Sequence, residues 1–361
     1  MNFKKIFIKD ACPTKIGGQA VMEGIMMKGE DRTAVAVRLP DSTLYIKTDK
    51  LKERGRLYRV PVIRGVLIFV DSMVTGVRTL MLSAELLESF DGESSDEDEE
   101  KEKGRFTRWL EKHFGEKAPM NLALILSVVF AIIFAVGIFV VAPTWVVNIF
   151  GVWIDNGVAL NLIEGAFRIL LFILYVFLIS KMKDIQTVFQ FHGAEHECIH
   201  CFESGRELTP QNCSEFETLH PRCGTSFLMF VMVISLLLFS LLGWPNLAIR
   251  IISRLVLIPV IAGLSYELLR WAGNSESLAV KILSVPGLLL QKLTTRKPDD
   301  SQLEVAIAAM KAVLVSPDTP VYEGPCDLEG RPIPQIARAE EIGEAATQET
   351  PVSEETHGTS D

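Results

Sequence analysis

The apolar positions of this chain gather into long runs separated by polar or charged stretches. Residues 120–142 contain no charged side chain, and residues 160–179, 227–242 and 247–269 are similarly apolar with few charges. A helix of about 20 apolar residues is long enough to cross the roughly 30 Å hydrocarbon core of a bilayer. The pattern therefore predicts an α-helical polytopic membrane protein with four transmembrane helices.

A different pattern precedes these runs. Residues 16–27 place three glycines among apolar positions, and glycine allows tight turns or close approach of two backbones. Residues 33–39 and 43–47 carry β-branched side chains on either side of a Pro-Asp-Ser sequence, which is a hairpin signal. We expect a small cytosolic β-containing domain over residues 1–62.

The rest of the chain divides where its composition changes. Residues 65–87 have apolar side chains at helical spacing, but Asp71 and Arg78 interrupt the run, which favours an interfacial helix over a spanning one. The expected segments after the β-containing domain are an interfacial helix at 63–88, an acidic linker with an amphipathic segment at 89–118, the four-helix bundle at 119–272 with a cytosolic metal-site loop at 181–226, interfacial and cytosolic helices at 273–315, and a disordered acidic tail at 316–361.

Lysine and arginine are distributed unevenly among the connections. The connections at 143–159 and 243–246 contain neither residue, whereas Lys181, Lys183 and both terminal regions supply them. Cytoplasmic loops are enriched in these cations, so both termini and the loop 181–226 are expected to face the cytoplasm. The prediction is a multi-pass protein of the bacterial inner (cell) membrane, and Lys9 and Asp10 interrupt the first apolar residues so that no signal peptide is expected.

The formal net charge of −9 hides a basic body. Residues 85–102 and 315–361 hold most of the excess acid, and outside them 24 acidic residues face 33 basic ones. A basic body fits an anionic membrane surface, so membrane lipids are the expected partners, with a membrane protein as a further possibility. No nucleic-acid partner is expected, because no aromatic stacking motif or base-reading helix accompanies the cations.

The candidate chemistry lies where the histidines concentrate, since four of the six lie between positions 192 and 220. His192, Glu195 and His196 form an H-x-x-E-H sequence, and His200 extends the same face of a predicted helix. In this inverted zincin order, the two histidines bind a metal and the glutamate acts as the general base. The alternative is that the histidines lie at the membrane interface, where they cap a helix and bind lipid phosphates.

His220 and Cys223 form a second half-site, because a histidine and a thiol three residues apart are common zinc ligands. Glu267 is a candidate carboxylate ligand, with an ion pair to Arg270 as its alternative. Cys198 and Cys201 have C-x-x-C spacing, but without a βαβ context we interpret them as bystander thiols. The expected cofactor is a divalent transition metal, zinc first, and the candidate residues are Glu195 as the catalytic base and His192, His196, His200, His220, Cys223 and Glu267 as ligands.

Several of these stretches resemble one known family. Residues 16–27, 191–202, 220–227, 265–270 and 293–311 are similar to the YqhQ-like bacterial membrane proteins, called domain of unknown function 1385 and described as predicted metal-dependent enzymes. The resemblance covers roughly residues 13–315 and is most specific at the HGAEH and HPRCGT motifs. It implies a polytopic bacterial membrane protein with a metal site. Glu197 and Lys28 depart from the family pattern without removing a proposed ligand.

Two functions follow from this site. An open coordination position with Glu195 as base predicts a metal-dependent hydrolase at the cytosolic face, acting on a peptide or a lipid. A shell filled by four protein ligands instead predicts a non-enzymatic membrane assembly or regulatory factor with a structural metal. Transport is a weaker third interpretation, based on the intramembrane charges Glu164, Arg168, Arg250 and Arg254.

Overall fold

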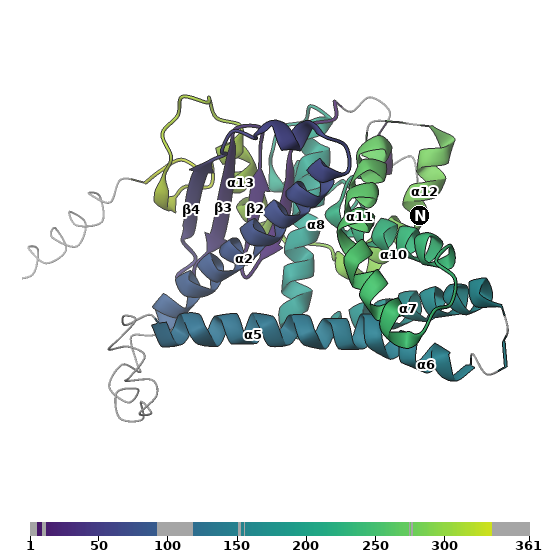
Figure 1. Cartoon of the computed structure of the whole chain (residues 1–361). Helices are drawn as coiled ribbons and strands as arrows, with labels where there is room; N and C mark the ends of the chain where they lie inside the picture. The colour runs from purple at the N-terminus through teal and green to yellow at the C-terminus, as the bar shows by residue number, and fades with distance from the viewer. Residues whose placement is uncertain are drawn as a thin grey trace, which may run out of the picture.

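The computed structural model describes residues 6–8, 12–91, 118–150, 153–154, 156–273, 275 and 277–333. The described chain is mostly helical, with a small antiparallel sheet at one end (Figure 1). The expected acidic linker falls largely on residues 92–117, and the last part of the expected tail on 334–361, so these parts of the prediction lie outside the described residues.

The sheet confirms the prediction of an N-terminal β structure. Its strands lie in the order β1-β2-β3-β4-β5, and every neighbouring pair is antiparallel. The expected hairpin is formed by β3 and β4, in which Arg38 pairs with Leu44. The strands are β1 (Gly17–Val21), β2 (Gly24–Lys28), β3 (Arg32–Arg38), β4 (Leu44–Lys50) and β5 (Glu323–Cys326).

The fifth strand corrects the prediction of disorder from residue 316 onward. Glu323–Cys326 pairs with β4, although the composition of this region is rich in proline and acid. The buried Arg32 side chain holds the chain before the strand, because its guanidinium donates to the carbonyls of Ser316, Pro317 and Thr319. A sequence pattern could not show this, since the anchor lies almost 300 residues away in the chain.

Both faces of the sheet are covered. One face packs on α8 (Lys183–Glu203) and α13 (Asp300–Val313), whose side chains join those of β2, β3 and β4 in the largest core cluster. On the other face, Met26, Val35 and Val37 contact the C-terminal part of α2 (Ile63–Asp91). The sheet therefore does not stand apart, because elements from far along the chain complete its core.

The remaining elements extend the helical part. They are η1 (Arg56–Arg59), α5 (Ala118–Val136), the π-helical turn η3 (Gly137–Val141), α6 (Ala142–Phe150), α7 (Gly157–Ile179), α9 (Pro210–Cys213), α10 (Gly224–Ser240), α11 (Leu247–Gly273) and α12 (Leu278–Thr294). Helix α10 packs against α7, α11 and α12. In Figure 1, α10, α11 and α12 are grouped on one side of α8 and the sheet on the other.

Four helical stretches of the described chain are long and apolar enough to cross a membrane: Ile63–Ser89, Leu126–Ile149, Gly157–Ile179 and Leu247–Ala272. The number agrees with the prediction, but one member differs. The first stretch is α2, which the sequence predicted to be interfacial, and the predicted span at 227–242 is the shorter helix α10. One interrupting charge of α2 is bonded, because the Tyr58 hydroxyl donates to the Asp71 carboxylate over 2.7 Å.

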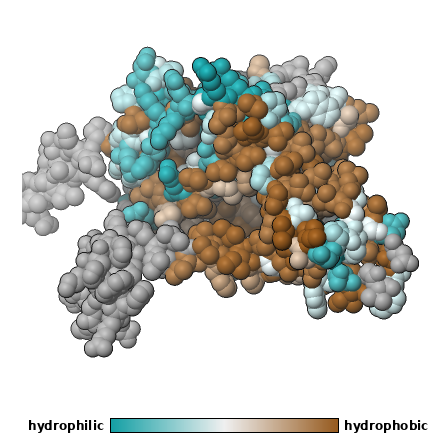
Figure 2. Space-filling view, viewed as in Figure 1, coloured by the Kyte–Doolittle hydropathy of each residue, from teal (hydrophilic) through white to brown (hydrophobic). Residues whose placement is uncertain are grey.

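The surface has an apolar part and a hydrophilic part. Apolar side chains cover the helical part around α5 and α11, and hydrophilic side chains gather over the sheet (Figure 2). Exposed large apolar residues are numerous on α5, α7 and α11, where Phe130, Leu170 and Val256 are each more than 60% exposed. A contiguous apolar surface of this kind is typical of helices that face lipid.

Candidate metal centre

Helix α8 presents the H-x-x-E-H sequence as predicted, on one face of a helix. Its residues Phe191, Ala194, Cys198 and Ile199 pack into the core cluster shared with the sheet. The neighbouring face carries His192 and His196, whose ring centroids lie 4.5 Å apart. The region expected to be a loop at 181–226 therefore contains a helix of 21 residues, and this helix positions the candidate ligands.

Three side chains converge at this face. His192, His196 and Cys223 each offer a ligand atom, and these atoms all lie within 4.8 Å of one another. The Nε2 atom of His192 lies 3.1 Å from the Sγ atom of Cys223. Cys223 is the N-cap of α10, and its sulfur accepts the backbone N–H of Thr225. The helix thus presents this sulfur from the end that carries partial positive charge.

Backbone carbonyls fix the orientation of both histidine rings. The Nδ1 atom of His192 lies 2.8 Å from the Thr294 carbonyl oxygen, and Nδ1 of His196 lies 2.5 Å from that of Thr218. A carbonyl can only accept, so in each neutral ring Nδ1 carries the proton and Nε2 keeps its lone pair. The Nε2 atom of His196 is buried without a hydrogen-bond partner among the described residues. This arrangement is typical of metal-binding histidines held by an outer carbonyl.

His200 and His220, both predicted ligands, lie next to the three converging residues but outside the group. Their ring centroids are 4.6 Å apart. Nε2 of His200 lies 3.0 Å from the Leu219 carbonyl oxygen. His220 accepts the Arg222 backbone N–H at Nδ1, and its Nε2 lies 4.0 Å from a carboxylate oxygen of Glu203. Burial lowers the pKa of His200 to about 4 and that of His220 to about 3, so both rings are neutral near pH 7.

Glu267 is not brought to this group. Its carboxylate accepts from Nε of Arg64 over 2.7 Å and from the backbone N–H of Val62 over 3.2 Å. The sequence analysis gave an ion pair with Arg270 as the alternative role of Glu267. The structure shows an ion pair with Arg64, at the start of α2.

Glu195, the predicted base, lies buried between α8 and β1. Its Oε1 atom accepts the backbone N–H of Gly18 over 2.8 Å. Burial raises the pKa of Glu195. Gly18 permits the contact, because a Cβ atom at this position would lie 2.6 Å from the Met26 carbonyl oxygen and 3.0 Å from Cδ of Glu195. One glycine of the N-terminal motif thus serves close backbone approach to the candidate base.

A buried ion pair secures the loop that carries His220 and Cys223. The Arg222 guanidinium contacts both carboxylate oxygens of Glu203, and Thr14 donates to the same carboxylate through its N–H and its hydroxyl. Burial raises the pKa of Glu203, but its interactions with His220, Arg222 and Thr14 outweigh this effect and lower the pKa to about 2. The loop is therefore tied to the last turn of α8.

Helix α12 supplies supporting groups that sequence reasoning missed. The Gln291 side chain accepts the backbone N–H of His220 and donates to its carbonyl, and also donates to the Ser226 hydroxyl. The Arg296 carbonyl oxygen lies so close to Gly193 that a Cβ atom at that position would collide with it. Gly193 was visible inside the HGAEH motif, but Gln291 and Thr294 carry no local signal.

The other cysteines of this region are buried thiols. Cys198, Cys201 and Cys213 are free and fully buried in the core cluster. The hydrogen bond with Cys213 raises the pKa of Cys201 most, and burial raises it further. The hydrogen bond with Cys198 is the main cause of the raised pKa of Cys213. Protonated thiols in an apolar core agree with the interpretation of bystanders.

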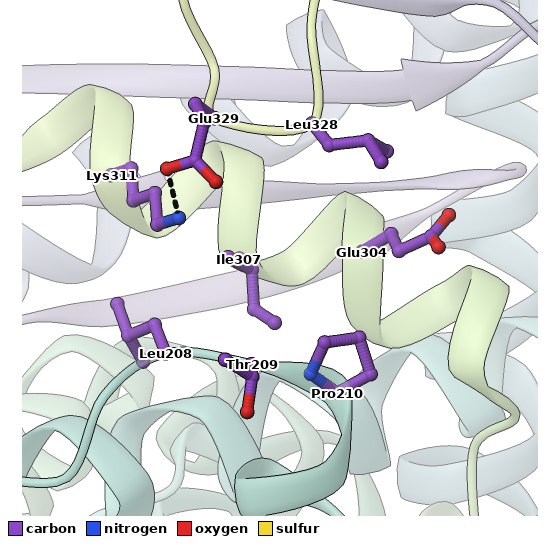
Figure 3. A pocket seen from close by; sticks show the side chains of 8 residues that line it. All are labelled: Leu208, Thr209, Pro210, Glu304, Ile307, Lys311, Leu328 and Glu329. Carbon is purple, nitrogen blue, oxygen red and sulfur yellow. Dashed lines mark hydrogen bonds and ion pairs between the residues drawn. The ribbon is translucent and has the colours of Figure 1, made fainter.

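A separate pocket of about 150 Å³ lies between α13, the start of α9 and the turn after β5 (Figure 3). Ile307 points toward Leu208, Thr209 and Pro210, and an ion pair between Lys311 and Glu329 closes one end. The residues that line it include no histidine or cysteine. It offers no site that competes with the three converging ligands.

Comparison with known proteins places this chain in a family. A family model described as "Protein of unknown function (DUF1385)" matches residues 60–316. The uncharacterized protein YqhQ of Bacillus subtilis (strain 168) is 30% identical over 312 residues, which cover 85% of this chain and 94% of YqhQ. No solved structure matches the chain.

Proposed function

The chain belongs to the DUF1385 family of proteins of unknown function, and we propose that it is a metal-dependent hydrolase at the cytosolic face of the bacterial inner membrane. His192, His196 and Cys223 would hold the metal ion, and Glu195 would act as the general base. One observation carries the proposal. The buried Nε2 atom of His196 has no hydrogen-bond partner among the described residues, yet it belongs to a side chain grouped with a second histidine and a thiol.

The donor set suits zinc. Imidazole nitrogen and thiolate sulfur are its usual ligands, and three protein ligands leave one tetrahedral position for a water or a substrate. A zinc ion bound here would polarise a carbonyl or phosphoryl group and make water more acidic. The carbonyls of Thr294 and Thr218 keep the two imidazoles in the tautomer that a metal requires.

Glu195 has the properties that a general base needs. Gly18 donates to Oε1 and thereby fixes one oxygen of the carboxylate. Burial raises the pKa of Glu195, which makes the carboxylate a better proton acceptor near neutral pH. The sequence order H-x-x-E-H supports this role, because the glutamate acts as the base in the inverted zincins.

The distribution of lysine and arginine supports a cytosolic site with both termini in the cytoplasm. The three candidate ligands lie on α8 and at the start of the apolar helix α10, close to helices able to cross a membrane. A substrate at this position would be a lipid or a peptide near the membrane surface.

The substitution Glu195→Gln tests the chemistry separately from the metal. The purified variant should keep its metal and lose hydrolysis of a panel of labelled peptides and phospholipids that the wild type cleaves. The substitution Glu197→Gln is the matched control, because Glu197 is the next residue but one on the same helix and pairs with Lys297. Wild-type activity in the Glu195→Gln variant would contradict the role of the base.

A structural metal is the second candidate. The observation that favours it is the bond from Gly18 to Glu195, which engages the proposed base in holding β1 against α8. In that case, the protein would be a membrane assembly or regulatory factor. It would bind metal without cleaving any member of the panel, and Glu195→Gln would lower its unfolding temperature.

A further inference from the structure

A buried group of charged side chains lies between α6, α7 and α11. Glu164 accepts from Arg168 over 2.8 Å and from Thr144 over 2.8 Å, and it also pairs with Arg254. Arg250 lies one turn before Arg254 on α11; it is 2% exposed and contacts the Asn148 side-chain oxygen over 2.6 Å. None of these residues is a candidate metal ligand.

The positive charges of this group exceed the negative ones. Among the described residues, the ion pairs of Arg168 and Arg254 both lead to Glu164, and Arg250 makes no ion pair. The Nε and Nη1 atoms of Arg250 are buried without a hydrogen-bond partner in the described part of the chain, and its guanidinium carbon lies 3.7 Å from the centroid of the Trp244 ring, which does not neutralise its charge. An unbalanced cation is costly inside apolar helices, so the group calls for an anion.

A cavity of about 200 Å³ opens beside the arginines. Arg168 and Arg254 are the charged residues of its described lining, and the Phe239 ring lies 5.6 Å and 5.4 Å from their guanidinium carbons. The remaining wall is almost entirely apolar and is built by α2, α10, α11 and η3, with Phe69, Phe139, Phe227 and Ile258 as its bulky members. Figure 2 shows a hollow in the apolar surface of the helical part.

We propose that this cavity binds an anionic amphiphile, with its charged group at Arg168 and Arg254 and its alkyl chain along the phenylalanine-lined wall. A small inorganic anion would leave the apolar wall unused, and an uncharged lipid would leave the excess of guanidinium charge unbalanced. Two sources share the required chemistry, an anionic phospholipid and a free fatty acid. The inference goes beyond the proposed hydrolase, because it does not depend on a metal at His192, His196 and Cys223.

Native mass spectrometry of the detergent-purified full chain tests the inference. The protein is titrated separately with dioleoylphosphatidylglycerol, oleate, dioleoylphosphatidylcholine and inorganic phosphate, and the retained ligand is counted per chain. Two variants remove different features: Arg254→Gln removes one cation, and Ala262→Phe fills the cavity without changing a charge, since Ala262 is a buried lining residue. Arg331→Gln is the matched control, because this exposed arginine pairs with Asp327 away from the cavity.

We expect the wild type and Arg331→Gln to retain phosphatidylglycerol or oleate about tenfold more strongly than phosphatidylcholine. Arg254→Gln should reduce this preference, and Ala262→Phe should abolish retention even if Arg254→Gln fails to fold. The anion that binds more tightly identifies the source. Equal retention of phosphatidylcholine, unchanged retention in Ala262→Phe, or binding of inorganic phosphate without either amphiphile would overturn the inference.

Discussion

The Nε2 atom of His192 lies 3.1 Å from the Sγ atom of Cys223, although the residues are 31 positions apart. His192 comes from the middle of α8 and Cys223 from the N-cap of α10. The end of α12 supports both, because Thr294 fixes the His192 ring and Gln291 holds the loop that precedes Cys223. The candidate site is therefore assembled by three helices and depends on how closely they pack.

The close contact between Gly193 and the end of α12 predicts the effect of a single methyl group. Gly193→Ala would push the Arg296 carbonyl away from α8 and pull Thr294 from the His192 ring. Loss of such an outer hydrogen bond typically weakens metal binding by about 10- to 100-fold. Competition with a chromophoric zinc chelator measures the change. Gly55→Ala is the control, because nothing lies within 4 Å of its added Cβ, and equal zinc affinities in both variants would contradict the prediction.

The contact between Gly18 and Glu195 gives a second prediction. Gly18→Ala would place a Cβ atom 2.6 Å from the Met26 carbonyl oxygen and 3.0 Å from Cδ of Glu195, so β1 must move. Since overpacking of this kind costs about 1–3 kcal/mol, the unfolding temperature should fall and hydrolysis should decrease while the metal is retained. The neighbouring substitution Gly17→Ala meets nothing within 4 Å and serves as the control. Indistinguishable melting curves for the two variants would count against the contact.

Much of this arrangement could be predicted locally. The H-x-x-E-H face follows from the helical period, and the β3–β4 hairpin follows from β-branched residues around a turn. The sequence could not show that Cys223 is the predicted ligand that joins His192 and His196, because this depends on which loop packs against α8. The carbonyls of Thr218 and Thr294 are backbone groups, so no side-chain pattern reveals them.

Composition misled near the end of the described chain. The stretch at residues 316–333 was predicted to be disordered, but Arg32 and β4 hold it through contacts far along the chain. The distant partner changes the environment that the local sequence implies. The interfacial position of α2 stays a prediction, because α2 is a candidate span by length and composition alone, and its C-terminal part packs on the sheet.

The low pKa of the Glu203 carboxylate predicts that the folded protein loses stability in acid. Its folded-state pKa of about 2 lies below the ordinary value of 4.5, so the group stabilises the fold above pH 4.5 and this contribution is lost as the pH falls toward 2. The full contribution is on the order of 3 kcal/mol. The unfolding temperatures of wild type and Glu203→Gln should differ most near pH 7 and converge between pH 4.5 and pH 2.

Glu215 provides the control for this comparison, because its side chain is 62% exposed and pairs with Arg206 at the surface. The variant Glu215→Gln should follow the wild-type pH profile closely. A difference between wild type and Glu203→Gln that stays constant from pH 7 to pH 2 would show that Glu203 does not contribute through its charge.

The metal content of the detergent-purified protein decides whether His192, His196 and Cys223 bind an ion. Inductively coupled plasma mass spectrometry should find about one zinc or other transition-metal ion per wild-type chain. Cys223→Ser and the double variant His192→Ala, His196→Ala should lose the ion, whereas His200→Ala and Glu267→Gln, which alter predicted ligands outside the group, should keep it. A metal-free wild type, or a folded Cys223→Ser variant with full metal content, would rule out this metal site.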